Sequence, residues 1–172
     1  MNPTLITLLP LSATLRLCVR KKLIYLKSSI MNTKVESLIT DYQTCTDQNE
    51  QAKIISILAN IGDDLALDLL VDVVGVEVAN HCQGNVRRVA ARGLEKMVIS
   101  TTDSEKRQRG IDKLSWALLN AEDWALRYAA AVSLGAVGTV EINTILHQAM
   151  TQESDRVVKE RIRMILNNCL IA

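Results

Sequence analysis

One segment of the chain recurs with a period close to 40 residues. A shift of 40 brings four identities into register: Arg87 with Arg127, Ala90 with Ala130, Ala91 with Ala131 and Leu94 with Leu134. Extended in both directions, the register is marked by Leu58, Leu94, Leu134 and Leu166, at spacings of 36, 40 and 32 residues. A period in this range predicts a chain built from repeated supersecondary units, each too small to bury its apolar face alone.

The composition indicates that these units are helical. No proline interrupts the chain after Pro10, and the sequence contains no phenylalanine and only 3% aromatic residues. A β-sandwich or barrel would need more turn residues and more aromatic side chains. We therefore predict an all-α fold, a HEAT-like solenoid of about four helix pairs (an α–α superhelix).

The apolar periodicity predicts where the helices lie. The expected ranges are residues 33–45, 48–61, 63–74, 86–98, 103–119, 123–135, 140–151 and 155–170. Small residues at Ala90, Ala91 and 129–131 favour close helix packing, and Gly62 and Gly138 are expected to end helices. Asp63, Asp103 and Asp123 are expected to cap helices or to lie in their first turns.

Charge and cysteine usage limit the possible partners. The chain has 20 basic and 19 acidic residues, a balance that argues against nucleic-acid binding through bulk charge. The four cysteines, Cys18, Cys45, Cys82 and Cys169, form no CxxC pair and have no zinc-site spacing. We expect a cytoplasmic protein without a metal or a permanent cofactor.

Residues 1–30 differ from the rest of the chain. They hold five basic residues and no acidic one, so that 15 basic and 19 acidic residues, a formal charge of −4, remain after them. Their apolar stretch is too short to span a bilayer, so no stable membrane insertion is expected, although a helix lying on a membrane surface is an alternative. We expect residues 1–30 to be a poorly ordered extension or a non-native start that can be removed, and residues 31–172 to be the functional domain.

The sequence Asn80-His81-Cys82-Gln83-Gly84-Asn85 is a polar break between two helical patterns. An adjacent His and Cys can supply an acid–base group and a nucleophile, and Arg87 and Arg88 follow closely. The competing interpretation is an ordinary repeat loop, in which Gly84 is a turn residue and Asn85 caps the next helix. Spacing alone favours this interpretation, because short motifs often match by chance.

A second cluster is Asp123-Trp124-Ala125-Leu126-Arg127-Tyr128. Trp124 and Tyr128 share a helix face and could form an aromatic wall, and Arg127 could bind a carboxylate. The alternative is that both aromatic residues pack between repeats and that Arg127 pairs with Asp123.

The Asp-Trp segment, set within HEAT-like repeats, resembles the E/F-type phycobilin lyases, which attach open-chain tetrapyrroles to cysteines of phycobiliproteins. The His-Cys loop is more specific and looks like the signature of F-type subunits of phycoerythrocyanin α-chain lyase-isomerases. The resemblance covers about residues 31–172.

This resemblance implies a heterodimer with an E-type subunit. It also implies phycocyanobilin as the substrate and the phycoerythrocyanin α chain as the acceptor, with isomerisation of the bilin to phycoviolobilin during attachment. His81 and Cys82 would be catalytic. Chemical suitability adds six expected bilin-binding residues: Arg87, Arg88, Asp123, Trp124, Arg127 and Tyr128.

Two other functions stay open at this point. The chain could be a plain bilin lyase, or a bilin-detaching relative, without isomerase activity. It could also be a noncatalytic HEAT adaptor, because solenoids of this size commonly serve as binding surfaces.

Overall fold

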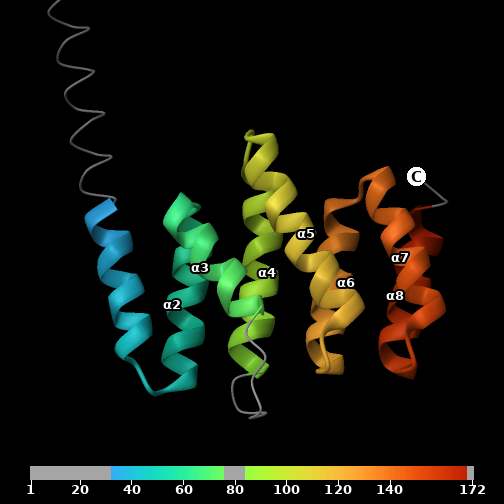
Figure 1. The fold of residues 1–172 in the computed structure, drawn as a ribbon, viewed down its shortest axis with the longest axis horizontal. Helices are drawn as coiled ribbons and strands as arrows, with labels where there is room; N and C mark the ends of the chain where they lie inside the picture. The colour runs from blue at the N-terminus through green and yellow to red at the C-terminus, as the bar shows by residue number, and fades with distance from the viewer. Residues whose placement is uncertain (1–31, 76–83, 170–172) are drawn as a thin grey trace, which may run out of the picture. The chain divides into compact units, whose positions relative to one another are not determined.

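The computed structural model describes residues 32–75 and 84–169, and all described regular structure is helical. A helix over residues 32–44 is followed by α2 (Gln48–Ile61), α3 (Asp64–Gly75), α4 (Gly84–Ser100), α5 (Ser104–Asn120), α6 (Trp124–Val137), α7 (Val140–Gln152) and α8 (Arg156–Cys169). Figure 1 shows α2 to α8 following one another in chain order. The predicted all-α class and the helix order are confirmed.

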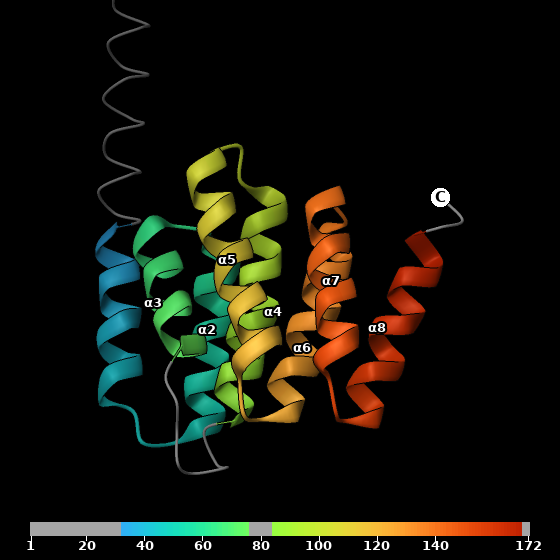
Figure 2. The same cartoon turned by 45° about the vertical axis from the view of Figure 1, so that its right-hand side comes forward.

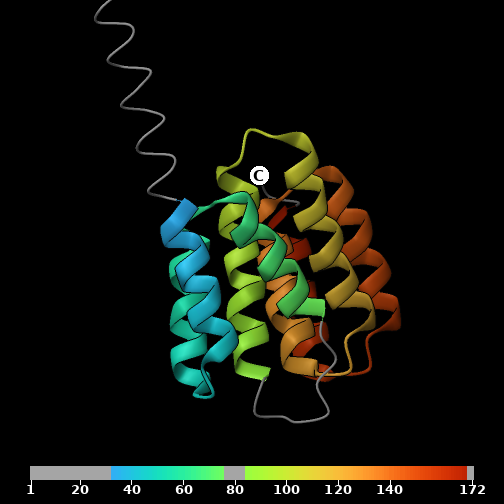
Figure 3. The ribbon, with the colours of Figure 1, turned by 60° about the vertical axis from the view of Figure 1, so that its left-hand side comes forward.

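The helices of the unit Val35–Ala172 form two layers. Helices α2, α4, α6 and α8 pack side by side in one layer, and α3, α5 and α7 pack in the other. In Figure 3, α2 and α4 lie to the left of α5 and α7, and Figure 2 gives an intermediate view. Each helix also contacts its chain neighbour across the layers, for example α3 with α4 and α5 with α6. This alternation of helices is the predicted stack of helix pairs.

The repeated apolar positions form the core between the layers. Leu58, Leu94 and Leu134 are fully buried, as the register predicts. Leu166 is only partly buried, and Ile162, one turn earlier in α8, is fully buried instead. The buried position in α8 is therefore shifted by one turn from the predicted one.

Small residues permit close approach of α4 to its neighbours. Ala90, Ala91 and residues 129–131 are buried, and the Ser133 hydroxyl donates to the Ala91 carbonyl across α6 and α4 at 3.3 Å. A Cβ atom added to Gly93 would lie 2.6 Å from Leu70 Cδ2 and 2.9 Å from Ala59 Cβ. Any side chain at position 93 would therefore push α2 and α3 away from α4.

The predicted helix ends are confirmed. Gly62 and Gly138 adopt left-handed conformations, with φ of 71° and 64°, and close α2 and α6. Asp103 and Asp123 cap α5 and α6, and the Asp63 carboxylate accepts from the Leu65 amide at 2.9 Å at the start of α3. These aspartates accept hydrogen bonds from the first-turn amides, which have no partner within their own helices.

Candidate functional site

The segment that contains His81 and Cys82 lies outside the described residues, but both residues that flank it are described. Gly75 ends α3 and Gly84 begins α4. The expected turn at Gly84 and helix cap at Asn85 are wrong, because both residues belong to the first turn of α4. The helical pattern therefore starts closer to the His-Cys pair than the sequence indicated.

Gly84 lies against two of the predicted site residues. A Cβ atom added to Gly84 would lie 3.2 Å from Asp123 Oδ2 and 3.8 Å from Arg88 Nη1. The fold thus brings the start of α4 to the start of α6. The Asp123 carboxylate and the Arg88 guanidinium group both lie beside Gly84, the first described residue after the His-Cys segment.

Arg87 connects the two helices that flank this segment. Its side chain is buried, and its Nε and Nη2 atoms donate to the Val74 carbonyl at 3.3 and 2.9 Å. Val74 belongs to the last turn of α3, where carbonyls have no partner within their own helix. The sequence suggested a propionate as the partner of Arg87, whereas in the structure these donors bind a backbone carbonyl.

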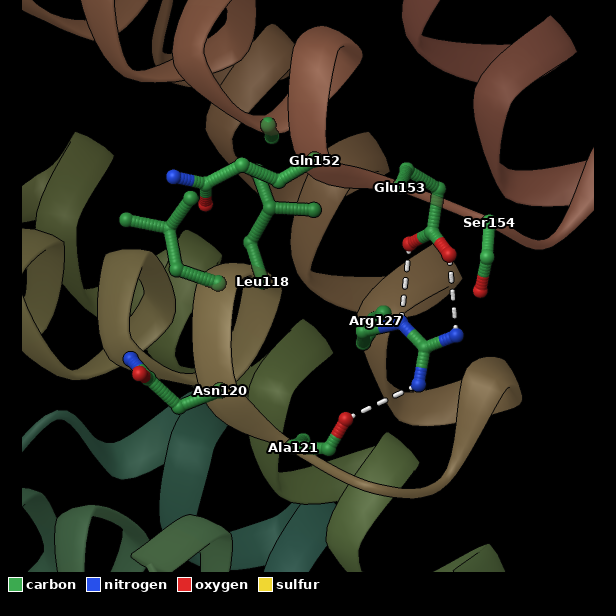
Figure 4. A pocket seen from close by; sticks show the side chains of 9 residues that line it. Leu118, Asn120, Ala121, Arg127, Gln152, Glu153 and Ser154 are labelled. Atoms are coloured by element: carbon green, nitrogen blue, oxygen red, sulfur yellow. Dashed lines mark hydrogen bonds and ion pairs between the residues drawn. The ribbon is translucent and has the colours of Figure 1, made fainter.

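Arg127 makes a bidentate ion pair with Glu153 (Figure 4). Arg127 Nε and Nη2 lie 2.8 and 2.9 Å from the two carboxylate oxygens, and Nη1 donates to the Ala121 and Glu122 carbonyls. Only 15% of the Arg127 side chain and 4% of the Glu153 side chain are exposed. The expected alternative pairing with Asp123 is therefore wrong. The Arg127 guanidinium group, expected from the sequence to bind a propionate, binds the Glu153 carboxylate instead.

The ion pair shifts both ionisation equilibria. Burial by itself raises the pKa of Glu153, but hydrogen bonds from Arg127 and from backbone amides, together with the Arg127 charge, outweigh burial and lower this pKa. The hydrogen bond to Glu153 raises the pKa of Arg127. The pair borders a cavity of about 200 Å³ between α5, α6 and the turn that follows α7 (Figure 4).

Glu153 was not predicted from the sequence. It is 26 residues from Arg127, and a pairing over this separation has no local spacing signal. Its carboxylate also accepts from the Asp155 amide at 2.8 Å, just before α8 begins.

The remaining residues of the second cluster point in different directions. Asp123 Oδ1 accepts from the Ala125 amide at 3.0 Å, which leaves Oδ2 facing Gly84. Trp124 is 49% exposed, whereas Tyr128 packs against the core with Arg161 5.8 Å from its ring centre. The expected packing between repeats holds for Tyr128 and is wrong for Trp124.

Arg88 lines a groove between α2 and α4. The groove has a volume of about 190 Å³ and is lined by Ser56, Ala59, Arg88, Val89, Arg92, Gly93 and Lys96. Arg88 was predicted from the sequence as a bilin-binding residue, whereas Arg92 and Lys96 were not. Their four-residue spacing along one helix was a readable signal, because residues four apart share a helix face.

Two features are absent from the described residues. These residues contain no group of three or more His, Cys, Asp or Glu side chains placed to bind a metal ion. None of the described helices combines the length and the apolar character that a membrane span requires.

The two-layer stack of helix pairs defines a HEAT-repeat protein, and residues 74–167 match the HEAT repeat family. The chain is 52% identical over 132 residues to the bilin biosynthesis protein PecF of Mastigocladus laminosus, across 77% of this chain and 62% of that protein. It is 53% identical over 133 residues to the protein of the same name from a Nostoc species, across 77% of each.

The chain therefore belongs to the family of bilin biosynthesis proteins of the PecF type. It spans less than two thirds of the Mastigocladus relative. A solved structure with the same fold is the complex of CpcE and CpcF of phycocyanin lyase from a Nostoc species. That match has a TM-score of 0.61 and 25% identity, and it covers 80% of this chain and 85% of the matched one.

Proposed function

We propose that the chain is one subunit of a heterodimeric phycobilin lyase-isomerase. Such an enzyme attaches phycocyanobilin to a cysteine of the phycoerythrocyanin α chain and converts it to phycoviolobilin. The identity of 52–53% to two relatives named as bilin biosynthesis proteins carries this proposal. The likeness to a chain of a phycocyanin lyase complex supports it.

The acid–base chemistry of a histidine suits the isomerisation step. The reaction moves a double bond of the bilin from C4=C5 to C2=C3, so one proton leaves a carbon and one proton returns to another carbon. An imidazole with a pKa near 6.5 can do both at neutral pH, and we assign this role to His81. The net proton balance of the step is zero.

The other roles follow from what each group can donate or accept. The Cys82 thiolate can add to the conjugated bilin and leave again, which interrupts the conjugation for as long as the bond lasts. Cys82 is two residues before Gly84 in the sequence. Asp123 Oδ2, next to Gly84, is an acceptor for pyrrole N–H groups.

Coexpression with an E-type subunit, phycocyanobilin and the phycoerythrocyanin α chain tests the function. We expect an α chain that carries covalent phycoviolobilin, identified from its absorption after denaturation. Attached but unisomerised phycocyanobilin would favour the plain lyase, and an α chain without bilin would contradict both enzymatic functions.

We also expect a stable complex with the E-type subunit. The matched solved structure is itself a complex of two lyase subunits. Size-exclusion chromatography of the two chains together should show a one-to-one complex. Full lyase-isomerase activity of this chain alone, as a monomer, would contradict the heterodimer.

A further inference from the structure

The groove between α2 and α4 carries a row of cations on one helix face. Arg88, Arg92 and Lys96 are spaced four residues apart on α4, so their Cα atoms are separated by about 6 Å per step along the helix axis. Arg88 makes no hydrogen bond or ion pair with any other described residue. Three basic residues thus border one groove over two helical turns.

The walls and floor of the groove are small or apolar. Gly93 and Ala59 lie where α2 and α4 approach most closely, and Val89 adds an apolar side. Because position 93 has no side chain, α2 can pack directly against α4 beneath the basic side chains. The groove therefore combines an apolar surface with cationic edges.

Two protein groups already contact these cations. Arg92 Nη1 lies 2.5 Å from a Glu95 carboxylate oxygen, and Lys96 Nζ donates to Asn60 Oδ1 at 3.2 Å. The Arg92 side chain is 48% exposed, so its ion pair is open to exchange with another carboxylate. Glu95 pairs with Arg92 and Asp123 lies near Arg88 at Gly84, so the three cations still outnumber the two neighbouring carboxylates.

The size of the groove limits what it can hold. Its volume of about 190 Å³ is below the roughly 300–1,000 Å³ of pockets that enclose a whole small-molecule ligand. It therefore suits the carboxylate-bearing substituents of a larger ligand, and the rest of that ligand would lie outside the groove.

We propose that this groove binds the two propionate groups of the bilin, an inference that rests on the proposed function. Arg88 and Arg92 each bind one carboxylate, and Lys96 adds a third positive charge. Arg88 also lies beside Gly84. It therefore binds the propionate on the ring adjacent to the reacting end of the bilin, and that end points toward Gly84 and Asp123. The groove thereby orients the reacting end of the bilin toward the start of α4.

The test is an absorbance titration of the chain, with its E-type partner, by phycocyanobilin and by phycocyanobilin dimethyl ester, which lacks the two carboxylates. The double variant Arg92→Ala/Lys96→Ala is expected to bind the free acid about tenfold more weakly than the unaltered chain. It should bind the ester as the unaltered chain does. Arg163→Ala, which removes an exposed ion pair with Glu160 on α8, is the matched control and should change neither affinity.

A second variant gives an effect of the opposite sign. Glu95→Gln removes the carboxylate that competes for Arg92, so the free acid should bind about threefold more tightly. Circular dichroism melts establish that each variant is folded.

Each other outcome is informative. If the unaltered complex binds the bilin but the groove variants match it, or lose acid and ester equally, the propionate site is overturned and the proposed function stands. If the unaltered complex binds neither form, both the site and the proposed function are overturned.

Discussion

Replacing His81 with alanine is expected to slow the double-bond migration by about 10²–10⁴-fold, the usual cost of losing an acid–base group. Attachment is expected to continue, because the acceptor cysteine supplies the nucleophile for ligation. The product should therefore change from bound phycoviolobilin to bound phycocyanobilin. The absorption spectrum of the purified, denatured α chain measures the ratio of the two adducts.

The chain offers a matched control for this variant. His147 is the only other histidine, and it lies exposed on α7. His147→Ala should leave the adduct ratio unchanged, whereas Cys82→Ser should shift it in the same direction as His81→Ala. A His81→Ala/Cys82→Ser variant that still yields mostly phycoviolobilin at the normal rate would exclude a catalytic role for the pair.

Glu153→Gln is expected to destabilise the chain by about 3 kcal/mol, because it leaves the Arg127 guanidinium without its carboxylate in a mostly buried site. Urea denaturation measures the loss. Glu160→Gln, which breaks the exposed ion pair with Arg163, is the control and should cost less than about 1 kcal/mol. If the two variants lose the same small amount, the buried pair does not contribute more than a surface pair.

The same pair predicts a pH dependence with a definite sign. Because the folded pKa of Glu153 is below its ordinary value of 4.5, its contribution to stability is fully present above pH 4.5. The contribution is lost as the pH falls through the lowered pKa in the folded state. The difference in unfolding free energy between the unaltered chain and Glu153→Gln should therefore shrink below pH 4.5.

The local sequence determined the helices and their ends. The predicted ranges agree with the observed helices within about two residues, since apolar periodicity, glycine and aspartate act within one or two helical turns. The buried leucines at 58, 94 and 134 followed from the repeat in the same way. The sequence also placed Arg88 on a helix, whereas its role in bilin binding stays a prediction.

Only the tertiary structure decided which groups the charged side chains meet. Arg87 and Arg127 occupy equivalent positions of the repeat and both donate to carbonyls at the end of the preceding helix, and Arg127 also pairs with the Glu153 carboxylate. These partners come from other helices or turns, so no spacing along the chain indicates them. A buried arginine needs a hydrogen-bond acceptor for its N–H groups. The packing of α3 on α4 and of α6 beside the α7–α8 turn decided which acceptors lie within reach.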